Sequence, residues 1–374
     1  MIIKRLSVSG YKNLKGIEIS LNPSLNIFCG ENAQGKTNLL ETIWLCSGCK
    51  SFRGTRDRDF IGFDEEKSEI LLKFVDKKRS QEILFSVLKD NIKDKKVLLN
   101  GVKLPLLSKL FGNLKCVIFT PEDLELSKGS PENRRNFIDL CICQIKPSYV
   151  SAINKYELLL SQRNALLKEI SLGISAEDSL DVWDFQLSQT GAYISLLRNT
   201  YTKKLNVFSE KLYYDLTKQR ESLSLSYNST IFSQLDERTD YKGEMADEYY
   251  QKLKSNLKDD VRYGFTQLGV HRDDIFSRIN GLNSRDFGSQ GQQRSIALIM
   301  KLSQAFILYD ETGDPPVVLL DDVLSELDLS RQHFVLNEIS EMQVFVTCCD
   351  PTAVLKHKMG TVFLMQEGKI THEI

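Results

Sequence analysis

Residues 30–37 are Gly30-Glu-Asn-Ala-Gln-Gly-Lys-Thr37, and this stretch decides the fold of the 374-residue chain. It matches G-x-x-x-x-G-K-[ST], the motif of a phosphate-binding loop that connects a strand to a helix. Residues 24–29 before it are typical of a strand, and residues 38–45 after it have apolar positions on one helical face. The sequence therefore predicts a nucleotide-binding α/β fold, with a plain glycine turn between strand and helix as the alternative.

Each position of this loop suits a bound nucleoside triphosphate such as ATP. Backbone N–H groups and the helix N-terminus surround the β-phosphate. Lys36, a predicted catalytic residue, reaches the β- and γ-phosphate oxygens, and the Thr37 hydroxyl ligates Mg²⁺. The predicted nucleotide-binding residues of the loop are Gly30, Glu31, Asn32, Ala33, Gln34, Gly35, Lys36, Thr37 and Asn38.

A second carboxylate for the metal is expected at the end of a neighbouring hydrophobic strand. Residues 317–322, Val-Val-Leu-Leu-Asp-Asp, supply it after four apolar residues. Asp321 is predicted to hold Mg²⁺ through water, and Asp322 is predicted to orient the attacking water as a general base. Related ATPases usually place the longer Glu at the position of Asp322. The alternative is a buried strand that ends in a polar loop.

A Ser/Gly/Gln cluster, residues 288–294, comes just before an amphipathic helix upstream of that strand. A hydroxyl, bare amides and the positive end of a helix dipole suit an anion. In the ABC ATPase superfamily, an equivalent signature loop contacts the γ-phosphate that is bound to a partner subunit. The same role is our hypothesis here, and an ordinary capped helix is the alternative.

Composition limits the possible partners. The 49 Lys and Arg against 50 Asp and Glu give a formal charge of -1, so any nucleic-acid surface must be a local patch. The available basic groups are residues 53–58, 77–79, 93–96, 134–135 and 203–204. No apolar run approaches the roughly 20 residues of a membrane span, so we expect no membrane contact and a cytoplasmic location. The eight scattered cysteines are expected to be thiols, not disulfides or zinc ligands.

Hydrophobic periodicity divides the chain. Alternation with period two dominates the first hundred residues, helical spacing covers residues 133–216, and α/β character returns toward the C-terminus. We predict a discontinuous ATPase head formed by residues 1–125 and 262–374. Residues 126–261 are predicted to form an inserted, mostly helical, arm-like second lobe.

Several short stretches together resemble the RecF family of bacterial recombinational repair ATPases, which is related to the head domains of SMC proteins. They are residues 10–13, 30–41, 51–53, 121–124, 128–135, 271–274, 289–294 and 319–328, and they span nearly the whole chain. The resemblance implies an ABC/SMC-type P-loop head with a helical second lobe. It assigns the contacts across a dimer to the signature residues Ser289, Gln290, Gly291 and Gln292 and to the D-loop residues Ser325, Glu326, Leu327 and Asp328, and it places Lys12 near the nucleotide.

The same resemblance implies a function. Such a protein dimerises when ATP is bound and engages DNA at gaps or at junctions of single and duplex strands. We further predict that it hydrolyses ATP slowly under stimulation by DNA. It helps the RecO and RecR proteins to load recombinase, in the cytoplasm and in association with the nucleoid.

Three departures from relatives favour slow hydrolysis or a stiffer loop. Ala33 stands where many relatives have Gly. Cys348-Cys349 follows the strand at which most ABC ATPases have a switch histidine, and Pro121-Glu122 occupies the region of their Gln loop. Two alternatives remain: the nucleotide-binding subunit of an ABC transporter, and a scaffold that uses ATP only to hold a dimer together without hydrolysing it.

Overall fold

The computed structural model describes residues 1–235, 240–351 and 360–373, and these fold into two compact units. Unit 1 comprises Met1–Asp123 and Ala297–Ile374, and unit 2 comprises Leu124–Ile296. Residues 262–296, which the sequence analysis assigns to the head, lie in unit 2. The reason is strand pairing, because β10 (Asp274–Ile279) pairs with β9 (Leu223–Asn228) along its whole length. The functional division into head and arm-like lobe stays a prediction.

A largely parallel sheet carries the phosphate-binding motif in unit 1, with the strand order β15-β14-β3-β13-β12-β8. Its strands are β3 (Leu25–Cys29), β8 (Cys116–Phe119), β12 (Val317–Asp321), β13 (Val344–Cys348), β14 (Thr361–Gln366) and β15 (Lys369–Glu373). β3, β8 and β12 are buried at every position, which is typical of parallel strands covered on both faces. The strands expected before the phosphate loop and before Asp321 are confirmed.

A second, antiparallel sheet completes unit 1, with the order β2-β1-β4-β5-β6-β7. Its strands are β1 (Ile2–Ser9), β2 (Ile17–Ser20), β4 (Lys67–Val75), β5 (Ser80–Leu88), β6 (Asn91–Leu99) and β7 (Val102–Leu104). Along β4, buried side chains alternate with more exposed ones, which explains the period-two pattern of the sequence. Asn100 and Gly101 close the hairpin between β6 and β7 with φ of 51° and 81°.

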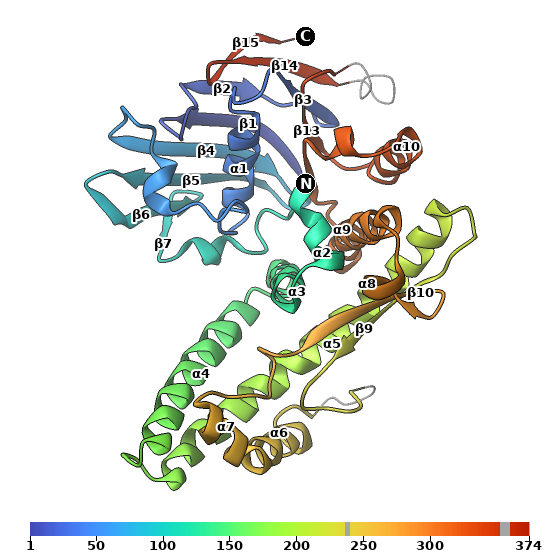
Figure 1. The fold of residues 1–374 in the computed structure, drawn as a ribbon. Helices are drawn as coiled ribbons and strands as arrows, with labels where there is room; N and C mark the ends of the chain where they lie inside the picture. The colour runs from blue at the N-terminus through green and yellow to red at the C-terminus, as the bar shows by residue number, and fades with distance from the viewer. Residues whose placement is uncertain (236–239, 352–359, 374) are drawn as a thin grey trace. The chain divides into compact units, whose positions relative to one another are not determined.

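Helix α1 (Lys36–Cys46) follows the phosphate loop and contacts β4 and β5 of one sheet as well as β12 and β13 of the other (Figure 1). It is therefore buried on more than the single face that the sequence predicts, and even Glu41 and Thr42 are inaccessible to solvent. The remaining helical segments of unit 1 are η1 (Asp57–Phe60), η2 (Leu107–Leu110), η5 (Val323–Glu326), α10 (Leu329–Glu338) and the C-terminal part of α9 (Gln290–Thr312). The short η3 (Pro121–Leu124) ends at the boundary between the units.

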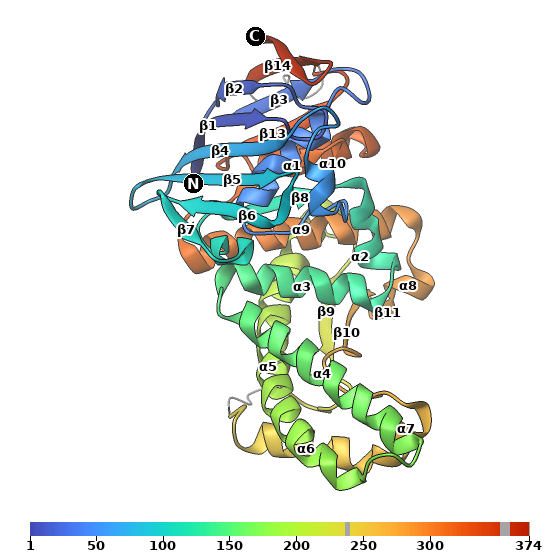
Figure 2. The ribbon, with the colours of Figure 1, turned by 90° about the vertical axis from the view of Figure 1, so that its left-hand side faces the viewer.

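Unit 2 is mostly helical, and its long helices α4 and α5 lie side by side (Figure 2). Its elements are α2 (Glu125–Lys128), α3 (Pro131–Ile145), α4 (Tyr149–Ser171), η4 (Glu177–Leu180), α5 (Asp181–Leu216), α6 (Glu244–Ser255), α7 (Leu257–Tyr263), α8 (Ser284–Phe287) and a small sheet in the order β11-β10-β9, with β11 at Leu282–Asn283. The helical region predicted for residues 133–216 from residue spacing is confirmed, and two further helices, α6 and α7, are separated at Asn256. No helix within the described ranges is both long enough and apolar enough to cross a membrane.

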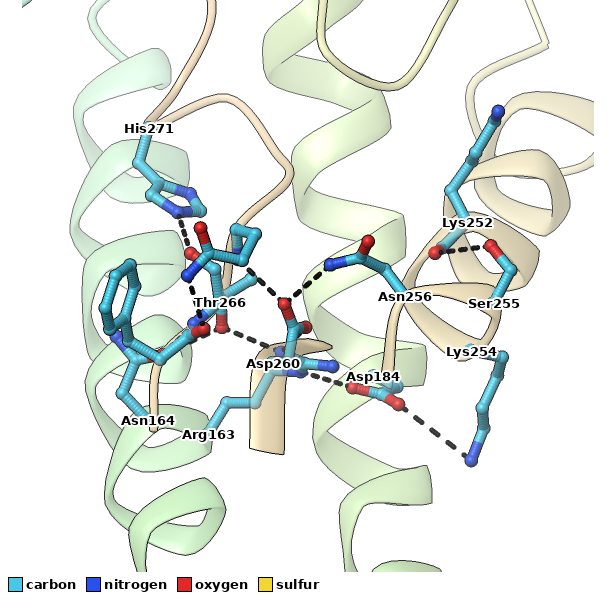
Figure 3. Close-up of polar contacts among 12 residues, drawn as sticks. Arg163, Asn164, Asp184, Lys252, Lys254, Ser255, Asn256, Asp260, Thr266 and His271 are labelled. Atoms are coloured by element: carbon cyan, nitrogen blue, oxygen red, sulfur yellow. Dashed lines mark hydrogen bonds and ion pairs between the residues drawn. The ribbon is translucent and has the colours of Figure 1, made fainter. Parts of the chain in front are cut away.

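A buried polar network holds the helices of unit 2 together (Figure 3). Arg163 of α4 donates from Nε to Asp184 of α5 at 2.6 Å, and from Nη1 to Asp260 of α7 at 2.7 Å. The same Nη1 donates to the Thr266 hydroxyl at 2.8 Å. Arg163, Asp184 and Asp260 are fully buried, so their charges are stabilised mainly by one another and not by water.

Candidate nucleotide-binding site

The phosphate loop lies at the carboxyl edge of the parallel sheet, where ligands bind in folds of this kind. It follows β3, which pairs with β13, and β13 pairs with β12. Ala33 and Gly35 both have positive φ, at 66° and 100°, so the chain turns sharply before α1 begins. The first backbone N–H groups of α1 therefore face the loop, as a phosphate site requires.

Lys36 is almost entirely buried, with 4% of its surface exposed. Its Nζ donates to the carbonyl oxygens of Gly30 at 2.6 Å and Glu31 at 3.0 Å, and it lies 3.6 Å from the Cys349 Sγ. These contacts hold the ammonium folded back over the loop, where the sequence analysis expects it to meet the phosphates.

Thr37 and the end of β12 meet across the sheet edge. The Thr37 hydroxyl donates to Asp321 Oδ1 at 2.9 Å, and the Thr347 hydroxyl of β13 donates to the same atom at 2.8 Å. Burial raises the pKa of the Asp321 carboxyl, and the hydrogen bonds from Thr347 and Thr37 oppose that shift. Asp322 donates its backbone N–H to the Thr347 hydroxyl at 2.9 Å and has a left-handed φ of 53°. Thr347 therefore aligns both aspartates, and nothing in the sequence alone singles it out.

The donor set fits Mg²⁺, because the Thr37 hydroxyl and the Asp321 carboxylate are oxygen ligands within hydrogen-bond distance of each other. Within the described residues, no group of three or more His, Cys, Asp and Glu side chains could hold a metal. Mg²⁺ commonly takes one or two protein ligands together with substrate phosphates. A metal at this position would therefore bind with the nucleotide.

A cavity of about 360 Å³ opens over the loop, within the size range of ligand pockets. Its lining residues are Asn13, Asn32, Ala33, Gln34, Gly35, Lys36, Thr37, Asn38, Arg53 and Asp322. The structure thus brings Asp322 into the same cavity as Lys36, although the two are far apart in the sequence.

Asn13 and Arg53 line the cavity but are not among the predicted site residues. Asn13 donates to the Ala33 carbonyl at 3.0 Å and accepts from the Asn38 amide at 2.7 Å. Arg53 donates to Asn38 Oδ1 at 3.0 Å. Both residues lie in short stretches that resemble RecF proteins, and that resemblance is the signal in the sequence that could have found them.

Lys12, predicted near the nucleotide, forms an ion pair with the buried Glu41 and donates to the Thr55 hydroxyl at 3.2 Å. It does not line the cavity, and its contact with nucleotide stays a prediction. Gln34 is a wall residue whose side-chain oxygen accepts a hydrogen bond from the backbone of Glu367.

The signature residues begin α9 in unit 2 as a reciprocal cap. Gln292 donates its backbone N–H to Ser289 Oγ at 3.2 Å, and Ser289 donates its backbone N–H to Gln292 Oε1 at 2.8 Å. Ser289 and Gln290 are exposed, and Gly291 is half-buried. The alternative of an ordinary capped helix thus describes the local bonding, while the role across a dimer stays a prediction.

The D-loop residues lie in unit 1 between Asp322 and α10. Ser325 donates to the Asp322 carbonyl at 2.6 Å, and Asp328 caps α10 by accepting from the Arg331 backbone at 2.9 Å. That backbone bond lowers the pKa of the Asp328 carboxyl. Ser325, Glu326 and Asp328 are exposed and Leu327 is half-buried.

Some of the basic groups named in the sequence analysis have structural roles. Arg134 is buried, and its Nε and Nη2 donate to the two Asp274 oxygens at 2.7 and 3.1 Å. Arg135 donates to the Asp273 carbonyl at 2.9 Å. Within residues 93–96, the side chain of Lys93 lies outside the described part of the structure. Arg134 is therefore unavailable to bind a nucleic acid.

A P-loop at the edge of this sheet, with a helix between two sheets and a second, mostly helical unit, defines an ABC-type ATPase of the SMC-head class. The family model described as the RecF/RecN/SMC N terminal domain matches residues 2–372. The crystal structure of the SmcHead bound to the C-winged helix domain of ScpA has a TM-score of 0.56 at 15% identity, and the match covers 100% of this chain and 98% of the other. At this identity the similarity supports the fold alone.

Relatives at higher identity narrow the class to one family. The DNA replication and repair protein RecF of Clostridium beijerinckii is 36% identical over 376 residues, which cover 100% of this chain and 99% of the relative. RecF of Clostridium botulinum type A is 38% identical, with 99% of each chain covered. The solved structure of the recombination mediator protein RecF with ATPrS, in the RecFOR pathway, has a TM-score of 0.91 at 34% identity and covers 98% of this chain and 97% of the other. The chain belongs to the RecF family of DNA replication and repair proteins.

Proposed function

We propose that this chain is an ATP-dependent DNA-binding clamp that acts in the recombinational repair of gapped DNA and at stalled replication. The observation that carries the proposal is that Lys36 and Thr37 line one cavity, and that Thr37 donates to Asp321, which also accepts from Thr347. An ammonium, a hydroxyl and a carboxylate in that arrangement suit a nucleoside triphosphate with its metal. ATP and Mg²⁺ are accordingly the proposed ligands.

Hydrolysis would proceed by in-line attack of water on the γ-phosphate. Lys36 neutralises charge on the phosphate oxygens, and Asp322 orients the water from the cavity wall. Mg²⁺, held by Thr37 and Asp321, supplies further charge neutralisation when it is bound. A carboxylate as short as Asp322 suits a slow enzyme, in line with the expectation of weak, DNA-stimulated turnover.

The nucleotide-binding site would be completed by a second copy of the chain. Ser289 and Gln290 are exposed, and so are Ser325 and Asp328 of the D-loop, which leaves them available to a partner. ATP would then act as the link that closes a homodimer around DNA. RecR, acting with RecO, is the proposed protein partner, and the cytoplasm with its nucleoid is the proposed location.

The test is sedimentation velocity of the full chain with and without ATP. We expect monomers without nucleotide and dimers with it. Ser289→Arg should abolish the ATP-induced dimer and still bind ATP, because residue 289 would contact only the partner's nucleotide. Ser148→Arg is the matched control, since Ser148 is also an exposed serine at the start of a helix. Normal dimers of the Ser289 variant, or monomers of the unaltered chain at saturating ATP, would refute the proposal.

A second measurement separates the clamp from a scaffold that does not hydrolyse ATP. Asp322→Asn keeps the backbone N–H that donates to Thr347 but removes the charge that orients water. We expect ATP turnover to fall by at least about tenfold, because a positioned general base typically contributes at least that much to the rate. Unchanged turnover in this variant would favour the scaffold.

A further inference from the structure

Three cysteines gather at the phosphate loop. Cys29 ends β3, Cys348 ends β13 and is its register partner, and Cys349 follows directly. Of the eight cysteines, all within the described residues, Cys349 alone is exposed, Cys348 is half-buried and the other six are buried. Reagents in solution therefore reach Cys349 first.

The Cys349 thiol lies directly over the nucleotide-binding loop. Its Sγ is 3.6 Å from the Lys36 Nζ and 3.6 Å from the Asn32 Oδ1. The Cys29 thiol donates to the Cys349 carbonyl at 3.0 Å and so fixes the backbone that carries this side chain. A group attached to the Cys349 sulfur would occupy space next to Lys36 and Asn32.

The chemistry around these thiols directs reaction to one of them. The thiolate is the form that attacks disulfides, and Cys349 is the one thiol of the three that is exposed to a reagent in solution. Burial raises the pKa of Cys29, and burial raises the pKa of Cys348 to about 12. Both neighbours are therefore poor nucleophiles at neutral pH.

We propose that this cluster is a thiol modification site, at which a small-molecule disulfide reacts with Cys349 and blocks nucleotide binding. The inference rests on the proposed ATP site. The Cys349 thiolate attacks one sulfur of the disulfide, a new sulfur–sulfur bond forms, and the other half leaves as a thiolate that takes up a proton. Excess thiol reverses the reaction and frees the loop. ATP and the modifying disulfide thus compete for the same space.

The experiment treats the full chain with oxidised glutathione, locates the adduct by peptide mass mapping, and measures the affinity for a fluorescent ATP analogue. We expect the adduct at Cys349 and a loss of affinity of more than roughly tenfold, reversed by dithiothreitol. Prior saturation with ATP should slow modification by a similar factor. Cystamine, a smaller disulfide of opposite charge, should give the same result if the adduct acts by occupying space.

Two variants sharpen the outcome. Cys349→Ser should bind the analogue with or without treatment, whereas Cys143→Ser, which removes a buried thiol of unit 2, should respond as the unaltered chain does. Failure of both disulfides to modify Cys349, or unchanged affinity after modification, overturns this inference alone. Absence of ATP binding by untreated protein overturns the proposed function instead.

Discussion

Ala33 adopts a backbone conformation that is unfavourable for alanine. Its φ of 66° lies in the left-handed region, which costs a residue with a Cβ about 1–2 kcal/mol. The Ala33 carbonyl accepts a hydrogen bond from Asn13, which helps to hold this conformation. Alanine at position 33, where many relatives have glycine, is therefore a source of strain in the phosphate loop.

Replacing Ala33 by Gly should raise the free energy of unfolding by about 0.5 to 1 kcal/mol, since relief of strain exceeds the greater entropy of unfolded Gly. Urea denaturation measures the change. The matched control is Ala165→Gly on the exposed face of α4, which should lower the free energy of unfolding by about 1 kcal/mol. A loss of stability in the Ala33 variant would show that the loop is not strained.

The fold also controls the charge state of His271 in unit 2. Its Nε2 lies 3.0 Å from the Thr266 carbonyl (Figure 3). Its Nδ1 lies 2.9 Å from the Tyr156 hydroxyl. A neutral ring that donates from Nε2 and accepts at Nδ1 satisfies both contacts. Burial lowers the pKa of His271 from 6.5 to about 4.

The folded chain should therefore lose stability as the pH falls from 6.5 toward 4, because the unfolded imidazole takes up a proton in this window before the folded one does. Urea midpoints measured across this range test the effect. His271→Gln should give a shallower dependence than the unaltered chain, whereas His372→Gln, at an exposed position of β15, should leave it unchanged. Parallel curves for all three proteins would contradict the argument.

At the scale of elements, the Arg163 network joins α4, α5 and α7. Arg163→Met keeps most of the side-chain volume but leaves Asp260 buried without its cation, and leaves Asp184 with only Lys254, whose Nζ lies 3.9 Å from Asp184 Oδ2. Removing one partner from a buried ion pair typically costs about 3–5 kcal/mol. We therefore expect a large fall in the free energy of unfolding of unit 2.

Calorimetry of the full chain measures this loss. Arg5→Met is the comparison, because Arg5 of β1 pairs with Glu18 of β2 at the exposed surface, where such pairs contribute about 1 kcal/mol or less. Equal effects of the two substitutions would mean that the buried network contributes no more than a surface pair.

At the scale of the whole molecule, the formal charge of -1 offers no general attraction to DNA. Arg134 is buried in an ion pair with Asp274, so it contributes to no basic surface. The proposed DNA binding would then depend on modest local patches. An ATP-linked dimer would double the number of phosphate contacts and so raise the affinity steeply.

We accordingly expect duplex DNA to bind more tightly with ATP than without it, with a dependence of log affinity on log salt that is about twice as steep. Fluorescence anisotropy titrations at several salt concentrations give both quantities. Lys36→Arg and Ser289→Arg should lose the ATP-dependent gain, and Ser148→Arg should keep it. If both of the former variants bound DNA as the unaltered chain does with ATP, dimerisation would not be the cause.

Local spacing along the chain determined the phosphate loop, the strand that ends at Asp321, and the helical character of residues 133–216. Each of these depends on neighbours within a few residues, and periodicity reports such neighbours directly. Tertiary structure alone decided that Thr347 bonds Asp321, that Lys12 pairs with Glu41, and that Arg134 is buried against Asp274. These partners are separated by 26 to 140 residues along the chain, so their meeting depends on strand order and helix packing, which no local pattern encodes.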